Sequence, residues 1–174
     1  MSPWDGVKIA VLLFVAAVAQ VSDFSQINVF GAAPDLLLVT LVAISLLRGS
    51  VAGAVGGFFA GLIVDIASLG TLGLTSLVLT LAGFWIGRYG ETTGRDRGHA
   101  PYLSIAVVTV LFEVGLLVVH FVLGESAPGG ALFSSLAPAV ALNLVVTGPV
   151  YWLVRRLLRP QALGDLSAEV QLLG

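Results

Sequence analysis

Two residues in one strongly apolar stretch could do chemistry inside a membrane. Glu113 and His120 are seven positions apart, so in a helix they share one face. A carboxyl and an imidazole so placed could pass a proton or hold a small ligand, and ionisable groups at membrane depth point to function because they are costly there. A structural interpretation is that burial keeps Glu113 neutral and hydrogen-bonded to Asn143. A third interpretation is a polar contact to the helix of a partner.

Two further acids lie where apolar stretches begin or end. Pro34-Asp35 has the pattern of a helix start, with an acid near the positive end of the helix dipole. Asp65 ends the next stretch, where the dipole disfavours an acid, so capping of its own helix does not explain it. We expect it to accept hydrogen bonds from the adjoining turn or from a partner. The hydroxyl donors in that turn are Ser68, Thr71 and Thr75. The other members of an expected outer rim without Lys or Arg are Asp23, Glu125 and His120.

Glycines recur at every fourth position of one apolar stretch. They are Gly49, Gly53, Gly57 and Gly61, with Asp65 continuing the stripe and a shorter version at Gly83 and Gly87. Residues four apart stack on one helix face, and a face of glycines lets another backbone approach closely. The stripe therefore predicts a close helix contact, either within this chain or with the transmembrane helix of a partner.

The residue types needed for an enzyme or a metal centre are not grouped in the sequence. Acids occur singly, and His99 and His120 are expected on opposite sides of the membrane. No phosphate-binding glycine loop is followed by Lys-Ser or Lys-Thr, and the chain has no cysteine. We therefore expect no catalytic residue, cofactor or metal.

Six apolar segments position these residues, and we expect each to cross the membrane as a helix. Their bounds are 7–21, 33–47, 51–67, 72–87, 102–123 and 136–157. The expected fold is an all-α polytopic membrane protein, with one compact six-helix domain over residues 1–160 and a cytoplasmic tail over 161–174. The first segment also has features of a signal peptide, since Lys8 precedes it and Ala17-Val18-Ala19 resembles a cleavage site.

The basic residues indicate which side of the membrane each loop occupies. All eight fall in segments that can share one side, and basic residues are retained in the cytoplasm. Both termini are therefore expected in the cytoplasm, in a multi-pass protein of the cytoplasmic membrane. The basic residues are Lys8, Arg48, Arg88, Arg95, Arg97, Arg155, Arg156 and Arg159.

Composition argues against a water-soluble domain and against a nucleic-acid binder. The chain is 57% hydrophobic and 10% charged, whereas soluble domains carry about 25% charged residues. Its net charge of −2 provides no basic surface for a phosphate backbone. The expected partners are thus membrane lipid and other proteins.

Several short motifs follow one another in a recognisable order. They are Pro34-Asp35-Leu36-Leu37-Leu38, the run 57–65 from Gly57 to Asp65, Leu69-Gly70, Gly73, and Gly83-Phe84-Trp85-Ile86-Gly87. This order resembles the MreD family of rod shape-determining membrane proteins, over about Pro34 to Gly90. Asp35, Gly57, Gly61 and Asp65 match motif positions of the family, whereas Glu113, His120 and Asn143 match none.

The resemblance implies a place in the bacterial machinery that inserts side-wall peptidoglycan. Its members are thought to be non-catalytic, to bind the single-span protein MreC, and to associate with the RodA glycosyltransferase, its partner transpeptidase and the actin-like MreB filament. The family is also distantly similar in fold to the substrate-binding subunits of energy-coupling-factor vitamin transporters. The alternative function is therefore such a subunit, with a ligand near the outer polar residues Asp23, Asp35, Asp65 and His120.

Overall fold

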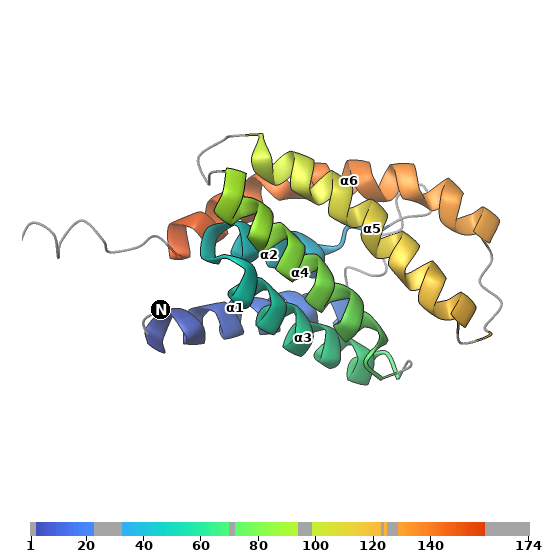
Figure 1. Cartoon of the computed structure of the whole chain (residues 1–174), viewed down its shortest axis with the longest axis horizontal. Helices are drawn as coiled ribbons and strands as arrows, with labels where there is room; N and C mark the ends of the chain where they lie inside the picture. Colours follow the sequence, from blue (N-terminus) through green and yellow to red (C-terminus); the bar gives the residue numbers. More distant parts are fainter. Residues whose placement is uncertain are drawn as a thin grey trace, which may run out of the picture.

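The computed structural model describes residues 3–22, 33–69, 72–93, 99–122, 124 and 129–158. In this part of the chain all regular structure is helical (Figure 1). The helices are α1 (Pro3–Ser22), α2 (Leu36–Arg48), α3 (Ser50–Ala67), α4 (Leu74–Thr93), α5 (Ala100–Val122) and α6 (Gly129–Leu157).

The short helix α2 lies at the centre of the molecule. It packs against each of the other five helices. These five surround it in the order α1, α3, α4, α5 and α6, each in contact with the next. Every residue from Leu37 to Leu46 is buried, as expected for a helix that is apolar on all sides. Its 13 residues span about 20 Å at 1.5 Å per residue, which is less than the roughly 30 Å of a bilayer's hydrocarbon core.

Three helices are long and apolar enough to cross a membrane. The qualifying windows are Trp4–Val21 in α1, Ser50–Ala67 in α3 and Leu136–Leu157 in α6. Shorter apolar helical segments cover Leu36–Arg48 and Ala100–Gly115. Length and composition in the described residues thus indicate a membrane protein, while crossing by all six helices stays a prediction.

Several helices are longer than the apolar segments that predict them. α4 continues to Thr93, beyond the predicted end at Gly87, and α6 begins at Gly129 rather than at Leu136. An apolar segment marks only the part of a helix that could lie in lipid. The polar turns at the helix ends therefore fall outside the predicted segments. The residues 88–93 that were expected to belong to a loop are helical, and this matters for Glu91 below.

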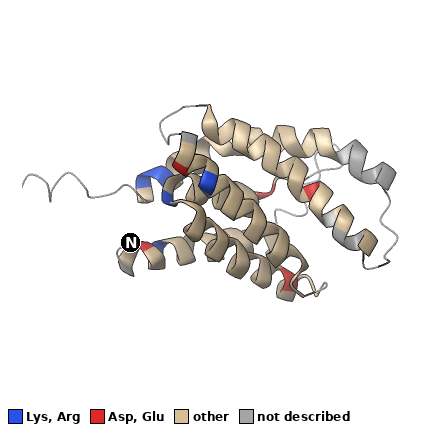
Figure 2. Cartoon of the chain, in the orientation of Figure 1, with Lys and Arg blue, Asp and Glu red and all other residues tan. Residues whose placement is uncertain are grey.

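Basic side chains gather at one end of the molecule. Figure 2 shows Lys and Arg concentrated where α1 begins and α6 ends, while acidic residues occur at this end and also farther along the helices. Arg48 at the end of α2 bonds the Asp5 carboxylate at 2.9 Å and the carbonyl oxygen of Leu158 at 3.0 Å. This arginine, expected only to orient the chain, thus ties the ends of three helices together. Arg95, Arg97 and Arg159 lie outside the described residues.

Candidate transmembrane interaction site

The predicted glycine stripe faces α4. A Cβ added at Gly57 would collide with the carbonyl of Leu79, and one at Gly61 would collide with the backbone of Ser76. Gly53 and Gly83 face each other across the same contact, and a Cβ added at Gly87 would collide with the backbone of Gly49 and Ser50. The two helix backbones are therefore in direct contact, and α4 occupies this face of α3 along its length (Figure 1).

Asp65 caps the helix next to its own. Its carboxylate accepts hydrogen bonds from the backbone N–H groups of Gly73 at 2.8 Å, Thr75 at 3.1 Å and Ser76 at 3.3 Å. These are N–H groups of the first turn of α4, which lack partners inside that helix. The residue is 3% exposed. The expected bonds from the adjoining turn are present, and Thr75 is a donor through its backbone N–H, whereas the Ser68 hydroxyl bonds the Val64 carbonyl instead. Thr71 lies outside the described residues.

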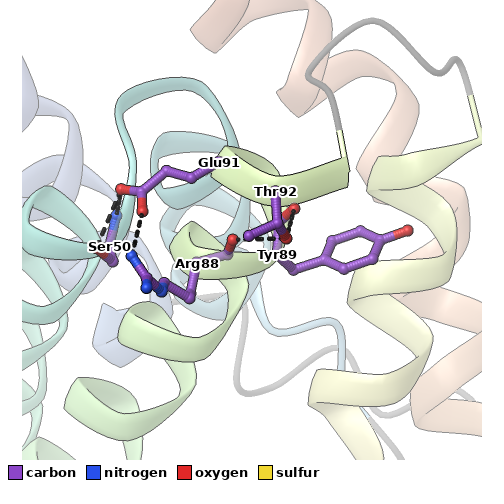
Figure 3. Close-up of polar contacts among 5 residues, drawn as sticks. All are labelled: Ser50, Arg88, Tyr89, Glu91 and Thr92. Atoms are coloured by element: carbon purple, nitrogen blue, oxygen red, sulfur yellow. Dashed lines mark hydrogen bonds and ion pairs between the residues drawn. The ribbon is translucent and has the colours of Figure 1, made fainter.

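Glu91 does the same at the other end of the pair. The N-cap residue of α3 is Gly49, which has no side chain, with a φ of +93° that favours glycine. One Glu91 carboxylate oxygen instead accepts from the Ser50 backbone N–H at 2.8 Å and from the Ser50 hydroxyl at 3.0 Å (Figure 3). Its other oxygen lies 3.5 Å from Arg88. The Ser50 N–H and hydroxyl, followed by Arg88, hold the pKa of Glu91 below its ordinary value of 4.5.

α3 and α4 therefore cap each other. They run antiparallel, so an acid at the carboxyl end of each lies beside the amino end of the other. Asp65 and Glu91 both sit where their own helix dipole disfavours an acid and where the neighbour's dipole favours it. The glycine contact and the two caps hold the pair along its length and at both ends.

The start of α2 is satisfied by side chains from two other helices and by its own cap. The Asp35 carboxylate accepts from the Leu38 N–H at 2.8 Å, which agrees with its predicted capping role. The Leu36 N–H donates to Gln20 of α1 at 2.9 Å, and the Asp35 N–H donates to Asn143 of α6 at 2.7 Å. Asn143 is 1% exposed and donates in turn to Thr109 of α5 at 3.0 Å. Backbone N–H groups at a helix end have no water to bond inside a membrane, and unpaired they would be costly. At the start of α2, side-chain oxygens of the protein accept these bonds instead.

The predicted hydrogen bond between Glu113 and Asn143 is wrong. Both residues are described, and no bond joins them, because the Asn143 amide is already engaged by Asp35 and Thr109. Glu113 is partly buried on α5. His120 lies within α5, but its side chain falls outside the description, as do Asp23 and Glu125. The proposed Glu113–His120 site and the outer rim therefore stay predictions.

An apolar groove runs between α1 and α3. It encloses about 700 Å³. Small residues form much of its floor, and its larger lining residues are exposed at the rims: Val51 is 72%, Phe59 59% and Phe14 55% exposed. The small lining residues are Gly6 and Ala10 on α1, and Ala52, Gly56 and Ala60 on α3. This second stripe of small residues combines alanine with glycine. It therefore leaves no glycine period in the sequence.

Nothing in the described residues groups three His, Asp, Glu or Cys side chains closely enough to hold a metal ion. The features that stand out are instead helix contacts: a closed glycine contact, buried capping groups and a groove with a floor of small residues. Together with the membrane-length apolar helices, they define an integral membrane protein built around helix packing.

Comparison with known families identifies the chain further. The model for rod shape-determining protein MreD matches residues 5–161, which is most of the chain, so this protein belongs to the MreD family. The resemblance seen over residues 34–90 is confirmed and extends over nearly all the helices. The family is a membrane component of rod shape determination. No curated protein and no solved structure matched the chain.

Proposed function

We propose that this protein is a non-catalytic membrane scaffold of the cell-elongation complex. It binds the single-span protein MreC through helix contacts in the membrane and positions the RodA-type glycosyltransferase with its transpeptidase. Membership of a shape-determining family supports the role, and the packing surfaces support the mode of action.

The α1–α3 groove is the observation that carries this proposal. Helices associate in lipid where small residues let backbones approach, and the glycine face of α3 is already covered by α4. The stripe Ala52, Gly56 and Ala60 lies on a different face of α3 and lines the buried part of the groove, where Leu13 of α1 already packs against Gly56. On the opposite wall, a Cβ at Gly6 would meet nothing within 4 Å, so space for a partner remains there.

The charge distribution supports a six-span topology with both termini in the cytoplasm. Lys and Arg gather at the end where α1 begins and α6 ends (Figure 2), and basic residues are retained on the cytoplasmic side. A single span entering the α1–α3 groove would then connect a cytoplasmic end to a domain outside the membrane. Such a contact would link synthesis enzymes on both sides through one scaffold.

Filling the groove tests the proposal. Gly6→Leu combined with Ala10→Leu should abolish co-purification of MreC from mild detergent, because both substitutions add bulk to the lining of the groove, and nothing lies within 4 Å of a Cβ added at Gly6. The matched control is Val18→Leu, also on α1, which is 45% exposed and does not line the groove. Mass spectrometry of the co-purified proteins, with thermal unfolding of each variant, gives the readout.

Two results would contradict the proposal. Undiminished MreC recovery with the folded double variant would show that the groove is not the contact. Recovery of an ATPase pair and a coupling membrane subunit with the wild-type chain would favour the vitamin-transporter function instead. A normal unfolding midpoint for the double variant separates lost binding from lost folding.

A further inference from the structure

A second groove, between α4 and α5, has a different lining. It encloses about 660 Å³, close to the volume of the first. Its walls carry large side chains: Leu77, Leu81 and Trp85 from α4, and Leu103, Val107 and Leu111 from α5 are all lining residues. Most of these are about half exposed, so the groove opens toward the surroundings of the molecule.

The polar groups of this groove are confined to one end. Ser104 lies one turn from the start of α5, and Tyr89 lies one turn from the end of α4. Figure 3 shows the Tyr89 ring pointing away from the Arg88–Glu91–Ser50 cluster and toward α5. Ser104 is 3% exposed, and among the described residues its hydroxyl is the buried side-chain polar atom that has no hydrogen-bond partner.

An unpartnered buried hydroxyl calls for an explanation, since burying a hydroxyl without a hydrogen bond is unfavourable. The rest of the groove is hydrocarbon-like, and its polar end lies at the end of the molecule where Lys and Arg gather (Figure 2). An occupant that matches this pattern is apolar along its length, carries hydrogen-bond acceptors at one end and has a negative charge just beyond them.

We propose that the α4–α5 groove is a binding site for one anionic glycerophospholipid. An acyl chain lies between α4 and α5, and the Ser104 and Tyr89 hydroxyls donate to oxygens of the ester and phosphate region. The basic end of the molecule favours the anionic headgroup. The inference goes beyond the scaffold function, because it concerns a lipid and a different pair of helices.

The lining favours a flexible chain over a protein helix. Close helix contacts in lipid need small residues, and the α1–α3 groove has five of them. The α4–α5 groove is lined mainly by Leu, Val and aromatic side chains, with Ala82, Ser104 and Gly115 as its small residues. An acyl chain can follow such an irregular wall, whereas a rigid helix would be held away from it.

Native mass spectrometry of the full chain in mild detergent tests the site, with phosphatidylglycerol and phosphatidylcholine as probes. We expect the wild type to retain phosphatidylglycerol in preference to phosphatidylcholine. Val107→Trp fills the groove and should weaken phosphatidylglycerol binding by about tenfold, a change that corresponds to losing part of the acyl-chain contact. Ser104→Ala removes one donor and should weaken it by about fivefold.

The matched control for the groove is Val145→Trp on α6, which is 75% exposed and lies outside the lining. Equal lipid retention by Val107→Trp and Val145→Trp would overturn the proposal, as would equal binding of both lipids with no effect of Ser104→Ala. A photo-crosslinker at Leu111 that captures a protein partner rather than lipid would also overturn it. The Gly6→Leu/Ala10→Leu variant should keep its lipid, so failure of the lipid site and failure of the scaffold contact are distinguishable.

Discussion

α4 packs against its two neighbours in opposite ways. Toward α3 it presents Ser76, Gly83 and Gly87, and the two backbones are in contact. Toward α5 it presents Leu77, Leu81 and Trp85, and a groove of about 660 Å³ remains between the helices. The same helix therefore makes a closed contact on one side and an open one on the other.

The difference shows how residue size determines whether two neighbouring helices pack closely or leave a groove between them. Lipid tails are as apolar as Leu, so large side chains gain little by leaving lipid for a neighbouring helix, whereas glycines permit close backbone packing. The α3–α4 contact also has carboxylate caps at both ends. We infer that α3 and α4 form a rigid pair beside the central helix α2 and that the α4–α5 side can exchange its occupant.

The strongest way to break the closed contact is to enlarge a glycine in it. Gly57→Leu should prevent folding, because even its Cβ would strike the Leu79 carbonyl. Gly57→Ala should destabilise the protein by about 1–3 kcal/mol, although alanine is the better helix former by about 1 kcal/mol. Thermal unfolding in detergent, followed by tryptophan fluorescence, measures both.

Two glycines outside this contact serve as controls. At Gly115 an added Cβ would lie 3.2 Å from the end of the Val78 side chain, which can move, so Gly115→Ala should have a small effect. At Gly6 nothing lies within 4 Å, so Gly6→Ala should leave stability unchanged or raised. If Gly57→Ala unfolds at the same temperature as Gly6→Ala, the backbone contact between α3 and α4 is not as close as described.

Removing one cap should have an intermediate effect. Asp65→Ala leaves three N–H groups at the start of α4 without their acceptor and should cost about 1–3 kcal/mol. Asp65→Asn keeps an acceptor oxygen and should cost less. Unfolding midpoints of the two variants provide the comparison, with Ser68→Ala in the exposed adjoining turn as control. Equal stability of Asp65→Ala and wild type would show that α4 does not need this cap.

The smallest expected effect is the pH dependence of the Glu91 cap. Its folded-state pKa is below the ordinary 4.5, so the carboxylate contributes stability above that pH and loses it as pH falls through the folded pKa. Glu91→Gln cannot ionise and should lack this loss. The unfolding midpoints of the two proteins should differ at about pH 7 and converge as the pH falls through the folded-state pKa of Glu91. A difference that stays constant across this range would mean that the Glu91 charge does not contribute.

Sequence reasoning located the close helix contact because its signal is local. A four-residue glycine period marks one helix face, and the structure places α4 against that face. The sequence also showed that Asp65 lies at the end of its helix where the dipole disfavours an acid. That position predicted that Asp65 bonds groups outside its own helix. The prediction named Thr75 among the donors to Asp65 but not Gly73 or Ser76, because backbone N–H groups carry no sequence signal.

Hydrogen bonds between residues far apart in the chain could not be predicted from the sequence. Asn143 was paired with Glu113 by depth alone, but its amide bonds Asp35, 108 residues earlier, because the start of α2 needs an acceptor. Glu91 lies beyond the predicted segment 72–87, which ends before the charged Arg88, although α4 continues to Thr93. The α4–α5 groove depends on how two helices diverge in space, which no single segment encodes.

The polar start of α2 has a consequence for how the protein is made. Its N–H groups find acceptors on Gln20, which precedes it in synthesis, and on Asn143, which follows 108 residues after Asp35. Until α6 emerges from the ribosome, the Asp35 N–H lacks its acceptor, Asn143. A chain that stops before α6 therefore leaves its central helix incomplete, and quality-control proteases could recognise that fault. The last helix made is the one that completes the second.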